Sequence, residues 1–187
     1  MNETLKTISE RYSCRSFNEK KPSDEDLNQI ANAVIASPSG MNRQNWRVII
    51  VKNRELIDEM ESEGMNVLAA MPDQSTYKRI MSRTGTLYYN APCMMIFPIE
   101  KAEPAGAELV DCGIVSQTAA LAATSLGIDN VICGLAGLCF ATEKADCFKK
   151  RLGFPDGFEF GCAILLGYAD KVTAPHVPDT SKISIVL

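Results

Sequence analysis

The chain has 187 residues, of which 46% are hydrophobic and 22% charged. These proportions are typical of a globular protein rather than a disordered one, and the length suits a single domain with one sizeable core. A formal net charge of −4 argues against a general nucleic-acid binder, which carries a basic patch. No apolar run is long enough to cross a bilayer, and the N-terminus lacks the apolar core of a signal peptide. We therefore expect a cytoplasmic protein with no membrane partner.

The first half of the chain is predicted to alternate helices with strands. Leu5 and Ile8 lie at helical spacing, and Ser23 is placed to cap a second helix that ends before Pro38 and Gly40. In chain order, the elements expected in this half are a helix over residues 3–11, the helix capped by Ser23, a strand over 46–52, helices over 55–63 and 77–83, and a strand over 93–97 that is closed by Pro98.

The second half of the chain contains the most apolar helix, predicted over residues 107–126. Its side chains are small and apolar nearly all round, so both of its sides must be covered by protein. Gly127 is placed to cap this helix. The elements expected after it are a strand over residues 128–133, a short helix capped by Thr142, and a last core strand that ends at Gly167.

This order of elements predicts one α+β or α/β domain over residues 1–187, with helices on both sides of a mixed sheet. Residues 168–187 are expected to form an extended C-terminal arm, because the segment is dotted with Pro and has no helical pattern. Its apolar end, ISIVL, is expected to pair with a sheet edge of its own chain or of a neighbour. Together with the apolar helix, this end favours an obligate homodimer.

The seven cysteines do not predict a metal site. They are odd in number and contain no CxxC pair, and the single His is far from any cluster. Cys93 and Cys162 lie in apolar runs, which indicates reduced thiols that fill the core. Such a composition fits a reducing compartment.

The segment Arg11-Tyr-Ser-Cys-Arg15 is a candidate phosphate site at the end of the first helix. Arg11 and Arg15 can direct two guanidinium groups towards one point, with the hydroxyl of Ser13 between them, and guanidinium groups bind phosphate oxygens in forked geometry. The alternative is a helix end whose side chains lie in water.

A polar loop, SPSGMNRQNW, leads directly into a core strand. Its amides and hydroxyls can hydrogen-bond the neutral rim of a ligand, but the loop holds no carboxylate, His or Cys for acid–base chemistry. Ordinary turn chemistry is the alternative, since Ser, Asn, Pro and Gly are common in loops.

Two weaker candidates lie in the second half of the chain. Gly134 and Gly137 follow a strand and allow backbone to approach a flat ligand, although their spacing is not that of a dinucleotide fingerprint and a plain turn is the alternative. Lys182 in the C-terminal arm is a possible third cation for a phosphate; alone, it is a surface lysine.

Taken together and in order, these segments resemble the FMN-dependent nitroreductase family. The resemblance rests on the sequences RYSCR, SPSGMNRQNW, NAPCMMIF, AALAATSLGIDNVICGLAG, RLGFP and AILLGYAD, and it covers nearly the whole chain. One departure is Asn45, which stands where the family usually has Pro.

The resemblance implies a homodimer with a mainly antiparallel sheet and two FMN sites at the subunit interface. Contacts to the phosphate and ribityl chain carry over to Arg11, Ser13 and Arg15. Positions around the flavin, several of which reach across from the partner subunit, match Pro38, Ser39, Asn42 and Gln44. Gly134 and Leu135 match the loop at the reactive edge of the ring, and Lys182 resembles a basic tail residue near the phosphate.

In such a protein, NADH or NADPH delivers hydride to flavin N5, and an electron-poor acceptor such as a nitroaromatic or a quinone then takes its place. The protein supplies position, polarity and exclusion of water, so no catalytic side chain is expected. Residues 63–86 are expected to form the lid over the ring.

Two alternatives belong to other classes of protein. A non-catalytic dimer that binds or stores FMN uses the same fold. A thiol enzyme that uses Cys133 or Cys139 lacks a neighbouring His to lower the pKa of either thiol.

Overall fold

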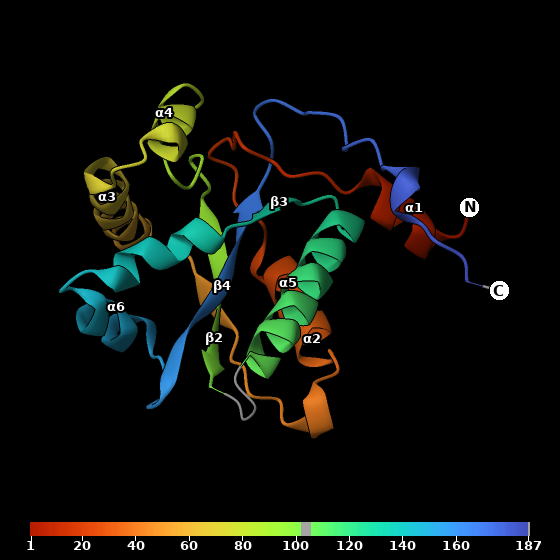
Figure 1. Cartoon of the computed structure of the whole chain (residues 1–187), viewed down its shortest axis with the longest axis horizontal. Helices are drawn as coiled ribbons and strands as arrows, with labels where there is room; N and C mark the ends of the chain where they lie inside the picture. The colour runs from red at the N-terminus through yellow and green to blue at the C-terminus, as the bar shows by residue number, and fades with distance from the viewer. Residues whose placement is uncertain (102–105, 187) are drawn as a thin grey trace.

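The protein folds as a four-stranded antiparallel sheet between two layers of helices (Figure 1). The computed structural model describes residues 1–101 and 106–186. The strand order is β1-β2-β4-β3, and each pair of neighbouring strands is antiparallel. The strands are β1 (Ile49–Val51), β2 (Cys93–Glu100), β3 (Asp129–Ile132) and β4 (Phe158–Gly167).

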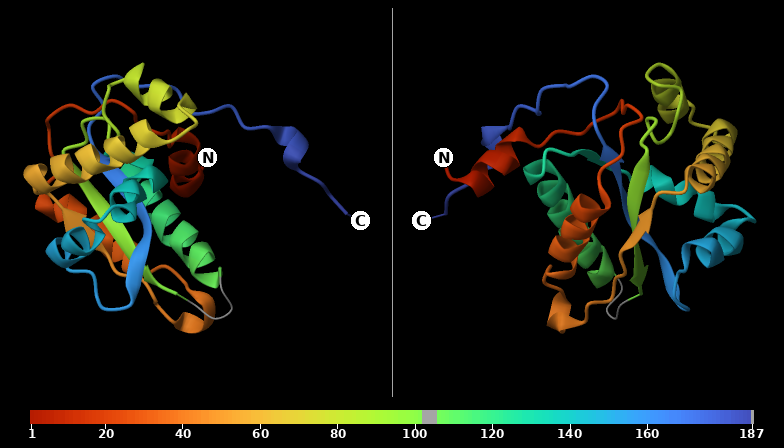
Figure 2. Two further views of the ribbon diagram at one scale, coloured as in Figure 1. Left: turned by 60° about the vertical axis from the view of Figure 1, so that its left-hand side comes forward. Right: turned by 180° about the vertical axis from the view of Figure 1, so that it is seen from behind.

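The helices cover both faces of this sheet (Figure 2). The helices α2 and α5 pack on one face, and α3, η2 and α6 pack on the other. The α-helices are α1 (Glu3–Glu10), α2 (Asp24–Ile35), α3 (Arg54–Ala70), α4 (Ser75–Met81), α5 (Ala107–Ser125) and α6 (Ala145–Leu152), and the 3-10 helices are η1 (Gly40–Asn42), η2 (Gly134–Ala141) and η3 (Thr180–Lys182). The predicted α+β class is confirmed, with a sheet that is antiparallel throughout the described residues.

The central strand β2 is buried on both faces because helices cover both sides of it. Successive side chains of a strand point to opposite faces, so Met94 and Ile96 join the core beneath α3 and η2, whereas Met95 and Phe97 join the core beneath α2 and α5. This double burial explains why the strand reads as a continuous apolar run rather than an alternating one.

Pro98 was expected to close this strand, but β2 continues to Glu100. The register of β2 against β4 shifts between Phe97 and Pro98, and this irregularity accommodates a residue that has no N–H to donate. Gly161 lies opposite the shift, where a side-chain Cβ would come within 2.8 Å of the Phe97 carbonyl oxygen.

Other boundaries also differ from the sequence predictions. The strand expected over residues 46–52 is only Ile49–Val51, and the helix expected over 77–83 is Ser75–Met81. The helix α3 runs to Ala70 rather than stopping near residue 63, and it passes through the buried Gly64. The CGLAG segment opens the 3-10 helix η2 instead of a plain turn. Lys144, not Thr142, is the N-cap of α6, although the hydroxyl of Thr142 accepts the backbone N–H of Lys144 at 3.3 Å.

The C-terminal arm leaves the body of the molecule, whereas α1 lies on its surface beside α5 (Figure 2). The helix α1 contains no buried residue, and residues 170–186 are exposed throughout (Figure 2). Ile183 and Ile185 are 73% and 81% exposed, so the apolar end of the arm does not pair with a sheet edge of its own chain. The helix α5 also leaves Leu109 and Val110 exposed. These surfaces are apolar without a partner in a single chain.

Gly64 lets α3 pack closely on η2, and its replacement is expected to destabilise the protein. A Cβ at this position would lie 2.6 Å from Cδ2 of Leu87, which is fully buried. Overpacking of this kind costs ~1–3 kcal/mol, which exceeds the gain of at most ~1 kcal/mol from better helix propensity. We expect Gly64→Ala to lower the urea midpoint at fixed protein concentration. Ser62→Ala, at an exposed position of the same helix, is the control, and equal midpoints for the two variants would contradict this packing.

Candidate functional site

The Arg11–Arg15 segment lies along the start of the edge strand β3. The backbone N–H of Cys14 donates to the carbonyl oxygen of Asn130 at 2.9 Å, and the hydroxyl of Tyr12 donates to Asp129 at 2.8 Å. Tyr12 and Cys14 therefore attach the segment to β3. The residues that alternate with them supply the remaining side chains of the segment.

These remaining side chains are Arg11, Ser13 and Arg15. Arg11 is the C-cap of α1 in an extended conformation, and Arg11 and Ser13 are half-buried. Arg15 is exposed, and its Nη1 donates to the carbonyl oxygen of Ser13 at 3.3 Å. Two cations and one hydroxyl thus lie on alternate residues beside the start of β3, and these residue types suit a phosphate.

Gly134 and Leu135 lie at the other end of the same strand, where β3 leads into η2. Gly134 is exposed, and a Cβ built on it would meet no atom within 4 Å. The backbone is therefore open to close approach by a flat ligand. The strand rises by about 10 Å from Asp129 to Ile132, so the RYSCR segment and the open backbone lie at opposite ends of one short strand.

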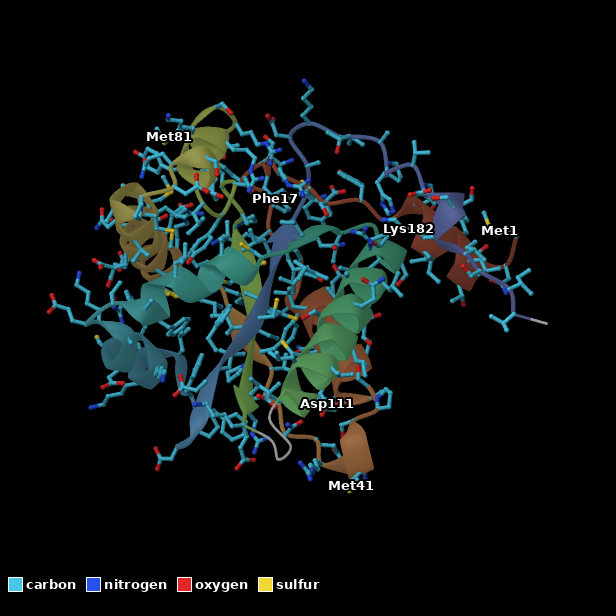
Figure 3. All side chains as sticks on the ribbon, in the orientation of Figure 1. Met1, Phe17, Met41, Met81, Asp111 and Lys182 are labelled. Carbon is cyan, nitrogen blue, oxygen red and sulfur yellow. The ribbon has the colours of Figure 1, made fainter. Side chains whose placement is uncertain are left out.

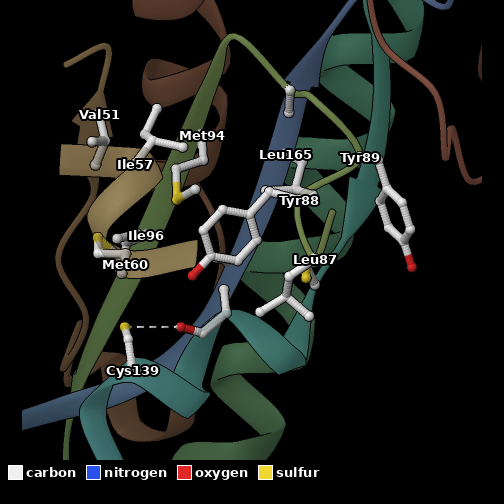
Figure 4. Close-up of a cluster of buried hydrophobic side chains, with 14 of the residues drawn as sticks. Val51, Ile57, Met60, Leu87, Tyr88, Tyr89, Met94, Ile96, Cys139 and Leu165 are labelled. Carbon is white, nitrogen blue, oxygen red and sulfur yellow. Dashed lines mark hydrogen bonds between the residues drawn. The ribbon is translucent and has the colours of Figure 1, made fainter. Parts of the chain in front are cut away.

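The helix η2 packs against the core around Tyr88 (Figure 4). The thiol of Cys139 donates to the carbonyl oxygen of Ala136 at 3.4 Å within η2. Gly137 allows close contact with the ring of Phe160, which a Cβ would approach to 2.7 Å. The start of η2 is thus positioned by its packing against the core, not by a free loop.

The loop that contains Pro38, Ser39, Asn42 and Gln44 adopts a strained conformation. Met41, Asn42 and Gln44 have φ values of 51°, 55° and 49°, in the left-handed region that non-glycine residues rarely occupy. Strain of this kind persists where surrounding contacts impose it, and it is concentrated at functional sites.

Two contacts with α5 hold this loop. The buried carboxylate of Asp111 accepts the backbone N–H of Gly40 at 3.1 Å, and the hydroxyls of Ser37 and Thr118 are hydrogen-bonded at 3.0 Å. Asn45, the departure from the family pattern, is buried and donates through Nδ2 to the carbonyl oxygen of Glu100 at 3.3 Å. Its side chain therefore ties the loop to the end of β2.

Inside the loop, the polar side chains support one another. Ser39 Oγ accepts the backbone N–H of Gln44 at 2.9 Å, and Gln44 Nε2 donates to Asn42 Oδ1 at 3.0 Å. Asn42 and Gln44 are nevertheless exposed, as is Pro38. Their remaining hydrogen-bonding atoms can reach a ligand outside their own chain.

The structure divides the predicted site residues into separate groups (Figure 3). Arg11, Ser13, Arg15, Gly134 and Leu135 lie along β3. The polar loop lies at the opposite end of the molecule, where Met41 and Asp111 are labelled, and Lys182 is exposed on the arm. One chain therefore does not bring all the predicted residues together.

The sequence analysis missed Asp111 and Thr118, which position the loop from α5. They interrupt an otherwise apolar helix, and a buried carboxylate needs a hydrogen-bond partner. That interruption was the available signal, but the sequence does not indicate that the partner lies 71 residues away, at Gly40.

A hollow of about 550 Å³ opens beside Phe17, Asn18, Lys21, Arg54 and Asn90. None of the predicted site residues lines it. The guanidinium of Arg54 is already engaged by Asp58 and by the carbonyl oxygen of Ala91, and Glu19 adds a carboxylate to the lining.

The thiols of Cys133 and Cys139 are poor nucleophiles in this fold. Burial raises the pKa of Cys133 to about 11 and that of Cys139 to about 12, so both remain protonated near neutral pH. Among the described residues, no group of three or more His, Cys, Asp or Glu side chains is arranged to hold a metal ion. The raised pKa values of Cys133 and Cys139 disfavour thiol chemistry at these two residues.

Comparisons with known proteins place the chain in a family. The family model described as "Nitroreductase family" matches residues 8–168. A crystal structure titled as a nitroreductase with bound FMN from Desulfitobacterium hafniense DCB-2 has 60% sequence identity and a TM-score of 0.97, and the match covers 100% of both chains. A second nitroreductase with bound FMN, from Bacteroides fragilis, has 28% identity and a TM-score of 0.88, also over 100% of both chains.

Among curated proteins, a putative NADH dehydrogenase/NAD(P)H nitroreductase from Archaeoglobus fulgidus is 29% identical over 168 residues, which are 90% of this chain and 86% of that protein. The fold is thus the α+β fold that these solved structures share. The chain belongs to the nitroreductase family. No helix within the described residues has the length and apolarity that a bilayer crossing requires.

The contact between Asp111 and Gly40 predicts how the polar loop responds to substitution. Asp111→Ala leaves the Gly40 N–H without its acceptor, a loss of about 1–3 kcal/mol, so the loop should open more often. We expect trypsin to cleave after Arg43 about fivefold faster or more in native Asp111→Ala than in the unmodified protein. Asp111→Asn, which keeps an acceptor oxygen, is the matched control, and equal cleavage rates for all three proteins would refute the role of this contact.

The burial of the thiols predicts their order of reaction. Cys147 is exposed, whereas Cys133 and Cys139 are buried with raised pKa values. We expect native protein treated with iodoacetamide at pH 8 to be alkylated at Cys147 well before Cys133 or Cys139, as measured by peptide mass spectrometry. Urea-unfolded protein, in which all seven thiols are free to react, is the control. Alkylation of Cys133 at the rate of Cys147 would revive the thiol hypothesis.

Proposed function

We propose that this chain is an FMN-dependent oxidoreductase that passes hydride from NADH or NADPH to an electron-poor acceptor such as a nitroaromatic or a quinone. The observation that supports this most directly is the arrangement along β3, with cations at one end and open backbone at the other. FMN has the matching shape, an anionic phosphate at one end and a flat ring at the other. When bound, it supplies the hydride chemistry that the side chains lack.

The residues along β3 fit FMN in polarity as well as in spacing. Arg11, Ser13 and Arg15 would hold the phosphate, and Gly134 with Leu135 would lie against the edge of the ring. No side chain along β3 is required to act as a nucleophile or a base. The role of the protein is to orient the ring, polarise it and exclude water.

A second copy of the chain completes the proposed site. In one chain, the loop lies at the opposite end of the molecule from β3 (Figure 1 and Figure 3). Its residues Pro38, Ser39, Asn42 and Gln44 would therefore reach the flavin of the partner subunit. The exposed apolar residues of α1 and α5 and the C-terminal arm, residues 168–187, supply surfaces for such a homodimer. The arm would wrap the partner and carry Lys182 towards a phosphate.

The reduced state of the cysteines supports a cytoplasmic location. All seven are free thiols, and five of them are buried. A reducing compartment keeps such thiols unpaired.

The proposed phosphate contacts predict a loss of FMN affinity when they are removed. Hydrogen bonds to charged groups contribute about 1.5–3 kcal/mol each, so the double variant Arg11→Ala/Arg15→Ala should weaken FMN binding by about 100-fold or more. The measurement is fluorescence titration of FMN into cofactor-stripped protein. Lys150→Ala, which removes an exposed cation from α6, should bind FMN with unchanged affinity.

Spectroscopy then separates the candidate functions. The enzyme should be yellow when purified, bleach on anaerobic addition of NADH or NADPH, and regain colour when a quinone is added. Tight FMN binding without reduction by either nicotinamide would favour the storage dimer. Colourless protein that takes up no added FMN would contradict both.

A further inference from the structure

The charges of the α3–α4 region are segregated along the chain. Acidic side chains occupy the first part of α3, and three of them form ion pairs. Asp58 pairs with Arg54, Glu59 with Arg151 at 2.5 Å, and Glu63 with Lys144 at 2.6 Å. These pairs offset part of the negative charge of α3.

The second part of the region carries an unbalanced positive charge. Lys78, Arg79 and Arg83 are exposed on and just after α4, and no described carboxylate lies within ion-pair distance of them. Asp73 is the single acidic residue of the sequence between positions 64 and 90. Its carboxylate accepts the N–H and the hydroxyl of Ser75, at 2.9 and 3.0 Å.

The helix α4 lies at the same end of the molecule as the residues along β3. Ile80 of α4 is buried in the same core cluster as Cys14 and Cys133, which flank the two ends of the proposed FMN site. Figure 1 shows α4 beside the segment that follows α1, and Figure 3 shows Met81 at the same end as Phe17. Three exposed cations thus lie at this end of a chain whose formal net charge is −4, where they can attract an anion.

We propose that Lys78, Arg79 and Arg83 bind the 2′-phosphate of NADPH, so that the enzyme uses NADPH in preference to NADH. This inference rests on the proposed function. NADPH differs from NADH by one phosphate group, which carries about 1.5 to 2 negative charges at neutral pH. Clustered guanidinium and ammonium groups bind a phosphate through charge-assisted hydrogen bonds, and they attract it at a distance. A solvated helix face with no ligand is the competing explanation.

The experiment measures the reduction of bound FMN by each nicotinamide in an anaerobic stopped-flow instrument. For the unmodified holoenzyme, we expect a second-order rate constant at least tenfold higher with NADPH than with NADH. The variant Lys78→Ala/Arg79→Ala/Arg83→Ala should lose at least tenfold with NADPH and less than twofold with NADH. Lys150→Ala, which removes one cation from α6, should keep both rates.

Inhibition provides a test that does not depend on the variant folding. Adenosine 2′,5′-bisphosphate should inhibit the unmodified enzyme at least tenfold more strongly than 5′-AMP, because it carries the additional phosphate. The preference for NADPH should also fall as ionic strength rises, since exposed charges are screened by salt.

Three results would overturn the inference. They are equal rates with the two nicotinamides, equal losses with both in the triple variant, and equal inhibition by the two adenosine phosphates. Each of these leaves the proposed function intact, because FMN is still reduced. Failure of both nicotinamides to reduce FMN that dithionite does reduce would instead reject the proposed function together with this inference.

Discussion

The functional arrangement depends on one constraint, the attachment of the Arg11–Arg15 segment to the edge strand β3. The hydrogen bond from the Cys14 N–H to the Asn130 carbonyl oxygen fixes the backbone of this segment. The hydrogen bond from the Tyr12 hydroxyl to Asp129 fixes which of its side chains face β3. Without these bonds the end of α1 would be a solvated terminus, since α1 has no buried residue of its own. The same strand continues into η2, so one element sets the distance between the cations and Gly134.

A second consequence of the fold is that one chain holds two halves of the proposed site at opposite ends. The polar loop is held in a strained conformation by Asp111 and Ser37, yet within its own chain it faces none of the residues along β3. The backbone of this loop is strained although the loop does not reach the proposed site of its own chain. The strain is explained if the loop contacts the site of a neighbouring molecule. The exposed apolar residues of α5 and of the C-terminal arm point to the same conclusion, because apolar surface in water is unfavourable.

Much of the fold could be predicted from local patterns. Ser23 caps α2 as expected because a side-chain oxygen followed by a helical run is a strictly local signal, and the apolar run of β4 ends at Gly167 as expected. The predictions failed where distant contacts override local preference. The helix expected over residues 55–63 continues to Ala70, because α3 packs on η2 at Gly64, and Pro98 does not end β2, because a register shift accommodates it.

The candidate site shows the same limit. The residue types of the RYSCR and SPSGMNRQNW segments indicated what each could bind. They did not indicate that Asn130 holds the first segment and Asp111 the second. The measurement that tests the central claim most directly is a crystal structure of the yellow protein with its FMN. The account predicts the phosphate against Arg11, Ser13 and Arg15 and the edge of the ring against Gly134. A phosphate bound elsewhere, such as in the hollow beside Lys21 and Arg54, would contradict it.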